Sequence, residues 1–292
     1  MFLLNPKRPA LRSIGPSEER RLTRELRGSL LENAYLIGLL SDYTLRGLLQ
    51  MGWGRFYRFG DWRPCKGLFY LDTTGLLIPT GTNPDSVQAF LAAALNEGLP
   101  IGRIIGAEQW VAQTEEALST SPAWSKKIRQ RFPEIGMVLE SKTLASLDEP
   151  NLRLARPHES QRIAESSALA MQEELNQNTN GKEFERLVSS KRDLIGNQRY
   201  YVLEENGRLI FQAYLSASTR EVSQIQGVYV PPALRGRGIA SRCVAEMCRR
   251  CFERTGWIAL RVQKRNLPAV AVYRKVGFVP FMDYLSVWYE RE

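Results

Sequence analysis

The sequence predicts a mixed α/β fold arranged in two domains. Segments with helix and strand periodicity follow one another through both halves of the chain, which is typical of proteins that pack helices on a sheet. A length of 292 residues suits two domains or one large one. The polar segment SLDEPN, residues 146–151, carries a proline and separates two patterned regions, so we take it as the linker. We therefore expect domains at residues 1–147 and 148–292.

The first half opens with a helix signal. Residues 17–44 are expected to form a helix with Ser17 as its N-cap, because the leucines of this segment recur at helical spacing. Two short strands should follow within residues 66–81, on either side of the turn Asp72–Gly75.

A further helix is expected over residues 82–98. Asn83 suits the N-cap, Pro84 the first helical position and Gly98 the stop. Residues 101–118 are typical of a strand, a turn and another helix. The first half is therefore rich in β and α elements and has no obvious reactive cluster.

The second half has the pattern strand, helix, helix, three strands, helix, strand, helix and a final strand pair. Its clearest turn is Asn206–Gly207, since Asn-Gly between apolar runs favours a tight hairpin. The expected segments are a strand at 152–157, helices at 159–175 and 181–196, strands within 199–217 and 221–230, a helix from Ile239, a strand at 257–263, a helix within 266–276 and the strand pair within 277–290.

The charge balance favours an anionic partner. The formal net charge is +9 and the isoelectric point is about 9.5, which suits nucleic acid, a membrane surface or a phosphorylated small molecule. Basic and acidic residues are intermixed, however, so charge alone does not choose among these partners. Apolar runs are shorter than the roughly 18 residues of a membrane span, and the first apolar segment is too short for a signal peptide. We therefore expect a cytoplasmic protein without a membrane partner.

Cysteine and histidine usage limits the metal and nucleophile chemistry. Cys243, Cys248 and Cys251 have the C-x4-C-x2-C spacing of plant-type ferredoxins, and Cys65 could supply a fourth ligand. The alternative, which we prefer, is an amphipathic helix that buries small apolar cysteines. His158 is the single histidine, so histidine-rich zinc sites are excluded, and no G-x-S-x-G or P-loop motif is present. We expect no metal.

The stretch VYVPPALRGRGIA, Val228–Ala240, combines the features of a phosphate-binding turn. An apolar strand ends at two prolines, and Gly236 and Gly238 permit positive φ and close backbone approach. A helix that begins near Ile239 presents unpaired N–H groups and the positive end of its dipole. Such converging donors suit phosphate oxygens, although a short basic turn without this function is the alternative.

The residues downstream resemble the GNAT superfamily of acyl-CoA-dependent N-acyltransferases. After the turn come an amphipathic helix, the strand WIALRVQ and the segment NLPAVAVYRKVGF. The family signature Q/R-x-x-G-x-G/A is matched by Arg235, Gly238 and Ala240. The later signature N-x-x-A-x-x-x-Y-x-x-x-G-F is matched by Asn266, Ala269, Tyr273, Gly277 and Phe278. The resemblance covers Leu152–Glu292 and implies a GNAT fold there, with a mixed, mostly antiparallel twisted sheet flanked by helices.

The resemblance also implies acetyl-CoA as the cosubstrate and a backbone cradle for its pyrophosphate. Val228 and Val230 match the strand that parts from its neighbour and holds the pantetheine arm. Asn266 lies at the start of the helix after the parted strands. Tyr273 matches the tyrosine near the thioester sulfur that protonates the departing thiolate, and a tyrosine packed against the sheet is the alternative. The cradle residues would be Arg235, Gly236, Arg237, Gly238, Ile239 and Ala240, with the arginines as secondary support.

The implied reaction is direct attack of a primary amine on the acetyl group in a ternary complex. An alkyl ammonium has a pKa of about 10.4 and must lose a proton before it attacks. The backbone N–H of Val230 is the candidate donor to the oxyanion. Glu173 and Glu174 are candidates for the general base, and a solvated helix end is their alternative.

The first half lacks the glycine signature. Its segments NAYLIGLL, GLLIPTGTNPDSVQAFLAAA and IGRIIGAEQWVAQTEEAL resemble an uncharacterised domain that precedes the acetyltransferase domain in one bacterial two-domain group. That region is often regarded as a degenerate GNAT-like half, which implies a non-catalytic domain here. Its expected role is either to wall one side of the acceptor cleft or to select the acceptor.

Two other functions are compatible with the resemblance. A tandem-GNAT aminoacyl-tRNA-dependent transferase would explain the net charge through RNA binding, but such enzymes usually lose the pyrophosphate turn. A catalytically silent acyl-CoA-binding regulator would keep the turn, and the retained Tyr273 argues against it. We prefer the acetyltransferase, with an amine from a small molecule or a protein and no nucleic-acid partner. The sequence identifies neither that amine nor the oligomeric state.

Overall fold

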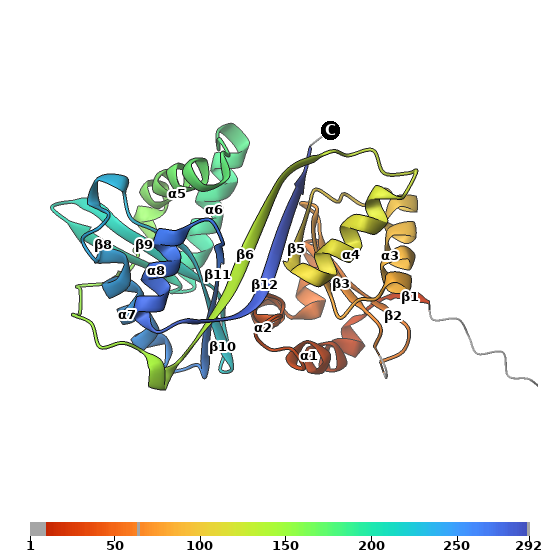
Figure 1. Ribbon diagram of the computed structural model, residues 1–292, viewed down its shortest axis with the longest axis horizontal. Coiled ribbons are helices and arrows are strands. Elements are labelled where there is room, and N and C mark those ends of the chain that lie inside the picture. Colours follow the sequence, from red (N-terminus) through yellow and green to blue (C-terminus); the bar gives the residue numbers. More distant parts are fainter. Residues whose placement is uncertain (1–9, 63–64, 291–292) are drawn as a thin grey trace, which may run out of the picture. The chain divides into compact units, whose positions relative to one another are not determined.

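The computed structural model describes residues 10–62 and 65–290 (Figure 1). By contact these residues form two compact units. The first unit takes in the described residues as far as Gly136, together with Gln263–Arg265 and those from Phe281 on. The second takes in Met137–Val262 and Asn266–Pro280. The division predicted between residues 147 and 148 stays a prediction, although the C-terminal segment belongs by contact to the first unit.

The first unit is a mixed sheet with helices packed on it. Strands β1 to β4 pair antiparallel in order, β4 pairs parallel with β5, and β5 pairs antiparallel with the C-terminal strand β12 (Val279–Tyr289). One apolar core surrounds Phe69 and Phe90, and another surrounds Leu22 and Phe56. The elements are β1 (Leu11–Ser13), α1 (Glu19–Arg27), α2 (Ala34–Gln50), β2 (Gly54–Phe59), β3 (Leu68–Asp72), β4 (Leu76–Thr80), α3 (Pro84–Asn96), β5 (Arg103–Ala107), α4 (Glu108–Ser119) and β6 (Ile128–Glu140), whose last residues belong to the second unit.

The first predicted helix is wrong in two respects. The segment 17–44 forms α1 and most of α2, with a turn between them, rather than one helix. Asn33 Nδ2 donates to Leu26 O at 3.0 Å, which satisfies a carbonyl at the end of α1 and favours a stop there. Ser17 is not the N-cap of α1, because it lies in a short 3₁₀ turn whose last residue, Glu18, precedes the helix.

Most other elements predicted for the first unit are confirmed. Asp72–Gly75 joins β3 to β4, and α3 has Asn83 as its N-cap and Pro84 at its first position. Gly98 follows the end of α3 with a φ of +62°. β5 leads directly into α4 without the predicted turn. β6 was not predicted, because the segment RFPEIGMV carries a proline and a glycine inside the strand.

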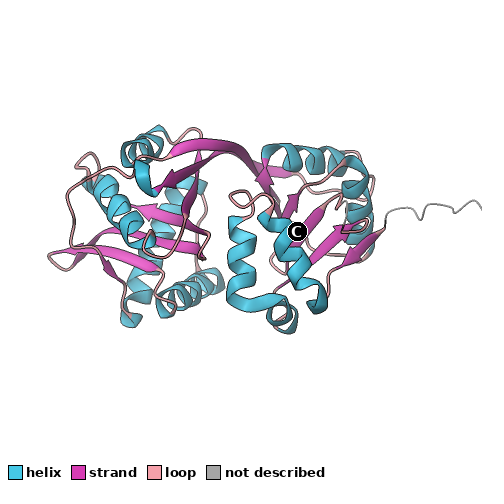
Figure 2. Ribbon diagram, turned by 90° about the horizontal axis from the view of Figure 1, so that it is seen from below, coloured by secondary structure: helices cyan, strands magenta, loops and turns pink. Residues whose placement is uncertain are grey.

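The second unit is also a mixed sheet flanked by helices (Figure 2). Strands β7 to β10 pair antiparallel in order, and β10 pairs parallel with β11. The predicted hairpin at Asn206–Gly207 joins β8 and β9. The element order repeats that of the first unit: strand, two helices, three strands, helix, strand and helix. The elements are β7 (Arg153–Leu154), α5 (Ser160–Leu175), α6 (Gly181–Gly196), β8 (Tyr200–Glu205), β9 (Arg208–Ser218), β10 (Val222–Tyr229), α7 (Ile239–Cys251), β11 (Trp257–Gln263) and α8 (Leu267–Val276).

The predicted final strand pair is wrong. Residues 279–289 form the single strand β12, of which Tyr284–Trp288 pairs with Arg103–Ala107 of β5 in the first unit. The segment contains no Asn-Gly or comparable turn signal, so nothing in it interrupts one continuous strand.

Helix α7 is the amphipathic helix expected from the cysteine spacing. Cys243, Cys248 and Cys251 are buried on it, and burial raises the pKa of the Cys243 and Cys251 thiols to about 12. Among the residues that the structure describes, no three histidine, cysteine, aspartate or glutamate side chains are grouped as a metal ion would require. No described helix is both long enough and apolar enough to span a membrane.

Candidate functional site

The turn between β10 and α7 is an open loop shaped by two glycines. A short 3₁₀ turn, Pro232–Leu234, follows the strand, and Gly236 and Gly238 then adopt φ of +78° and +72°. A Cβ added at Gly236 would meet no atom within 4 Å, so backbone conformation rather than crowding requires glycine there. Gly238 is the N-cap of α7 and offers no side chain, and the first N–H groups of a helix have no partner inside it. The turn therefore presents backbone donors at the positive end of the α7 dipole.

Strands β10 and β11 are paired over only part of their length. The parallel ladder joins Val222–Ile225 to Trp257–Leu260 and ends there. Beyond it the register of β10 with β9 shifts after Gln226, and Gly227 takes a φ of +63°. A Cβ at Gly227 would lie 2.5 Å from Tyr214 Cε1, so the bulge requires glycine. Gly227 was not predicted as a site residue, and its only sequence signal is a glycine inside a strand pattern.

The predicted strand and helix residues lie on either side of this turn. Val228 and Val230 continue β10 past its last pair with β11, the first half-buried and the second buried. Ile239 is buried at the start of α7, and Ala240 beside it is half-buried. The backbone of these residues therefore leads from the end of the ladder to the helix start.

Arg235 braces the turn. Its Nε donates to Val230 O at 3.0 Å, and its guanidinium pairs with Glu173 at the end of α5, with Nη2 at 2.8 Å from Oε2. The guanidinium also lies over the Tyr229 ring, 5.7 Å from the ring centroid. The arginine lowers the pKa of the Glu173 carboxyl through these hydrogen bonds. Arg235 thus ties the strand end, the turn and α5 together.

Asn266 and Glu174 meet where α5 ends and α8 begins, and Tyr273 lies further along α8. Asn266 is the N-cap of α8: its Oδ1 accepts from the Ala269 N–H at 3.2 Å, and its Nδ2 donates to Glu174 Oε1 at 3.3 Å. Tyr273 is 7% exposed, and its ring lies edge-on to that of Phe278, with centroids 5.9 Å apart. Burial raises the pKa of Tyr273 well above its usual range, and the charge of Glu174 raises it further.

A pocket of about 470 Å³ lies beside the N-terminus of α7. Three cations, Arg237, Arg242 and Lys275, line it together with Gly238 and the segment Ser146–Glu149. Cations around a helix start suit an anion, so two of them are candidate binding residues that were not predicted. Arg242 could have been found because it follows Gly238 by one helical turn, whereas nothing local marks Lys275.

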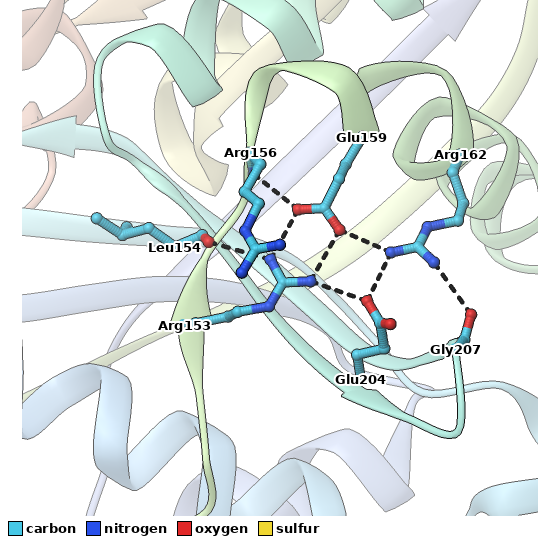
Figure 3. Close-up of polar contacts among 7 residues, drawn as sticks. All are labelled: Arg153, Leu154, Arg156, Glu159, Arg162, Glu204 and Gly207. Atoms are coloured by element: carbon cyan, nitrogen blue, oxygen red, sulfur yellow. Dashed lines mark hydrogen bonds and ion pairs between the residues drawn. The ribbon is translucent and has the colours of Figure 1, made fainter.

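A cluster of charged side chains fixes the start of α5 (Figure 3). Glu159, whose side chain is 3% exposed, accepts from the Arg156 N–H and from the guanidinium groups of Arg153 and Arg162. Glu204, beside the hairpin, lies 2.8 Å from the same two guanidinium groups. The hydrogen bond from Arg153 is the main cause that lowers the pKa of Glu159, to about 2. The cluster positions the helix whose far end carries the two candidate bases.

The comparison with known families gives a match over the part of the chain that contains the glycine turn and α8. Residues 167–278 match the family model of the acetyltransferase (GNAT) family. Nearly all of this segment lies in the second unit. No curated protein matches the sequence.

Solved structures similar to this chain confirm the predicted fold over both halves. A protein of Drosophila has a TM-score of 0.69 at 14% identity, with 97% of this chain and 99% of that chain covered. A GCN5-related N-acetyltransferase from Sphaerobacter thermophilus has a TM-score of 0.56 at 17% identity, with 98% and 97% covered. A tandem GNAT protein from the clavulanic acid biosynthesis pathway has a TM-score of 0.55 at 11% identity, with 96% and 97% covered. Both halves of the chain are therefore GNAT-like in fold.

Proposed function

We propose that the second unit transfers the acetyl group of acetyl-CoA to a primary amine by direct attack in a ternary complex. The observation that carries this proposal is the open glycine turn at the start of α7, which directly follows a strand that has parted from its parallel neighbour. Backbone donors at a helix start suit a pyrophosphate, and an unpaired stretch of strand suits an extended arm that forms main-chain hydrogen bonds. Acetyl-CoA carries both groups.

The donor-binding role falls to the turn Arg235–Ala240 and to the end of β10. Its glycines leave the backbone N–H groups accessible, and the pocket cations, Arg237 among them, add positive charge beside them. Val228 and Val230 are the residues to which we assign the pantetheine arm. Asn266 holds the start of α8 and so orients Tyr273 on the same helix.

Glu174 is the stronger candidate for the general base. An alkyl ammonium must lose its proton before attack, and a carboxylate near the acyl group could accept it directly or through a water. Glu173 is held by both terminal nitrogens of Arg235, which lowers its pKa and makes it a weaker base. Glu174 instead accepts a hydrogen bond from Asn266, and its charge acts on Tyr273. We assign the stabilisation of the oxyanion to the backbone N–H of Val230.

Tyr273 is the proposed general acid. Its raised pKa keeps the phenol protonated throughout the neutral range, so Oη always has a proton to donate. A thiolate, with a pKa of about 8.5, is already a fair leaving group, so this proton assists departure without being indispensable.

The test is release of CoA from acetyl-CoA across a panel of amines. Tyr273→Phe should lower kcat about 100-fold and leave the affinity for acetyl-CoA close to that of the wild type, because only the proton is lost. Glu174→Gln should slow turnover by a similar factor, whereas Glu173→Gln should not. Wild-type turnover in Tyr273→Phe would remove the tyrosine from the mechanism.

The same panel separates the other two functions. Binding of acetyl-CoA without transfer to any amine would favour a silent regulator. Tight, salt-sensitive binding of tRNA without affinity for CoA would favour the aminoacyl-tRNA-dependent transferase. The first half, residues 1–147, has no assigned reacting group, and we propose that it is a non-catalytic domain that selects the acceptor.

A further inference from the structure

Lys191, on α6, is a buried lysine with which no carboxylate of the described residues pairs. It is 6% exposed, and its Nζ lies 5.4 Å from the ring centroid of Tyr200 and 4.5 Å from that of Tyr214. The two rings are stacked, with centroids 5.6 Å apart, and their faces attract the ammonium. Among the described residues no acidic group forms an ion pair with it, and burial lowers its pKa to about 8. The ammonium group of Lys191 therefore contacts the faces of two tyrosine rings and is not neutralised by a carboxylate of the described residues.

The two tyrosines belong to a polar row that crosses the sheet. Tyr200 pairs with Tyr214 between β8 and β9, and Tyr214 pairs with Gln226 between β9 and β10, so the three side chains share one face. Tyr214 Oη donates to Gln226 Oε1 at 3.0 Å. Gln226 is half-buried and Gly227 is exposed. The row thus leads from the buried ammonium to the part of β10 that lies beyond its ladder with β11.

Gln212, on the same face of β9, has an acceptor that lacks a donor. Its Nε2 donates to Ser167 Oγ at 3.1 Å, and that oxygen lies 3.4 Å from Tyr200 Oη. Its Oε1 is buried and has no hydrogen-bond partner among the described residues. Gln212 also pairs across the sheet with Tyr229, whose ring lies under Arg235. An amide oxygen without a described partner therefore lies on the face of β9 that carries Tyr214, at the position that pairs with Tyr229.

These two unpaired groups are complementary to one kind of ligand. A carboxylate would form charge-assisted hydrogen bonds with the ammonium of Lys191, and an N–H or O–H of the same ligand would satisfy Gln212 Oε1. A purely structural role explains the lysine less well, because an apolar side chain of similar volume fills a buried position at least as favourably. Neither group has a part in the proton transfers assigned to Glu174 and Tyr273.

We propose that the acetyl acceptor is an amine that also carries a carboxylate, such as an amino acid, and that Lys191 binds this carboxylate. The inference rests on the proposed acetyl transfer. In that reaction the amine nitrogen bonds to the acetyl carbon as the C–S bond breaks. An ammonium acceptor first loses one proton to Glu174, which releases it to solvent, and the second proton leaves the nitrogen for Glu174 as the amide forms. The sulfur takes a proton from Tyr273, which regains one from solvent. Lys191 determines which amines are accepted and transfers no proton.

The experiment compares amino acids with the matching amines that lack the carboxylate. Phenylalanine, tryptophan and glycine are paired with phenethylamine, tryptamine and methylamine, and kcat/KM is measured for each in the wild type and in Lys191→Met. We expect at least a 10-fold loss of kcat/KM for the amino acids in the variant, mainly through KM, and a much smaller loss for the amines. Because each comparison is made between wild type and variant on one substrate, differences in amine pKa cancel.

The exposed Lys182 on the same helix supplies the matched control. Lys182→Met removes a lysine from α6 without touching the polar row, so its amino-acid to amine ratio should equal that of the wild type. The thermal midpoint of Lys191→Met should not fall, since a buried charge is replaced by an apolar side chain. Equal losses on amino acids and amines in Lys191→Met would show a merely structural lysine and overturn the proposal.

A binding measurement decides the proposal even if no amine is acetylated. N-acetylphenylalanine and N-acetylphenethylamine differ in the carboxylate and need no turnover, and their affinities can be measured by calorimetry with CoA present. At least 10-fold tighter binding of the carboxylate compound, with loss of this difference in Lys191→Met, would support carboxylate binding by Lys191. If no amine is acetylated, only the proposed acetyl transfer is then wrong. Equal affinities, or binding of neither compound, would overturn the site.

Discussion

The two units contain equivalent strand–helix connections that are built in opposite ways. In both, a strand leads through a glycine of positive φ, Gly81 at +59° and Gly238 at +72°, into a helix. At the start of α3 the helix caps itself: Asn83 Oδ1 accepts from the Ser86 N–H at 2.8 Å, and Pro84 has no N–H to offer. At the start of α7 no side chain takes this role. The same topology is thus closed in the first unit and open in the second.

The neighbouring parallel strands differ beyond their ladders, of which the one in the first unit is the shorter, since it joins only Leu76 and Leu77 to Arg103 and Ile104. The carbonyl oxygen of Pro79 in β4 approaches Gly106 in β5 so closely that a Cβ there would lie 3.2 Å from it. In the second unit the ladder stops at Ile225 and Leu260, and Gly227 bends the strand beyond it. A ligand site in this fold therefore depends on the few residues around the strand end and the helix cap, and not on the order of the elements.

A third equivalent position is the turn before the first long helix of each unit. The sequences GPSE and RPHE each end in a glutamate that accepts a hydrogen bond from the backbone N–H three residues earlier, at 3.2 Å for Glu18 and 2.7 Å for Glu159. Glu18 also accepts from Trp62 and pairs with Arg58, whereas Glu159 pairs with two arginines. Both units therefore contain this backbone-to-glutamate hydrogen bond, but two arginines pair with the glutamate in the second unit.

The largest effect is expected from matched glycine substitutions at the two turns. Gly238→Val should lower the affinity for acetyl-CoA at least about 100-fold, because a β-branched residue resists a φ of +72° and the turn must move its N–H groups. Gly81→Val places the same strain at the closed connection of the first unit. It should lower the thermal midpoint and leave the affinity as it is. Calorimetric titration with acetyl-CoA measures both, and an unchanged affinity in Gly238→Val would disprove the cradle.

The glutamate pair should differ in stability. Glu159→Gln removes a buried carboxylate from two partly exposed guanidinium groups, which keep only Glu204, and should cost about 2 kcal/mol of unfolding free energy, against about 1 kcal/mol for Glu18→Gln. The comparison is made by urea denaturation at neutral pH. Equal losses in the two variants would mean that the additional arginine contributes nothing.

The same pair predicts a dependence on pH. The pKa of Glu159 in the folded protein, about 2, lies below its ordinary value of 4.5. The contribution of this carboxylate to the free energy of unfolding is therefore present above pH 4.5 and is lost as the pH falls towards 2. Burial would raise the pKa of Glu18, but hydrogen bonds from Trp62 and Gly15 and the charge of Arg58 lower it overall. The contribution of Glu18 to stability is therefore also lost on acidification. The stability difference between wild type and Glu159→Gln should therefore shrink on acidification below pH 4.5.

The smallest effect is expected at the helix caps. Asn83→Ala removes the side-chain cap of α3 and should cost about 1 kcal/mol without change in acetyl-CoA affinity. Ser241→Ala, in the first turn of α7, removes only a bond from Ser241 Oγ to Gly238 O at 3.0 Å and should cost less. Tighter binding of acetyl-CoA in Asn83→Ala would show that the closed connection of the first unit retains a donor site.

The features predicted correctly from the sequence are those decided by residues close together in the chain. Asn206–Gly207 makes its hairpin because both residues tolerate positive φ, and Asn83 caps α3 through a bond to a residue three positions away. The helix α7 and the glycine turn before it follow from periodicity and from Gly236 and Gly238 in the same way. The break between α1 and α2 was missed because the bond from Asn33 to Leu26 is not visible in helical periodicity.

The features that were missed depend on which distant segments meet. The strand β12 lies beside β5 of the first unit, Arg235 reaches Glu173, and Glu159 gathers its arginines from β7 and α5. Lys191 looks in the sequence like any helix lysine, and only packing places it over two tyrosine rings.

By itself, then, the sequence determined the local backbone: the glycine turn, the caps, the hairpin and the acetyltransferase signatures, because the conformational preferences of neighbouring residues act without the rest of the chain. The tertiary structure alone decided which glutamate at the end of α5 pairs with Arg235 and which accepts a hydrogen bond from Asn266, which helix start is closed, and which lysine is buried. The reason is physical: hydrogen bonds, desolvation and charge pairing depend on distance in space, and the fold sets those distances for residues far apart in the chain.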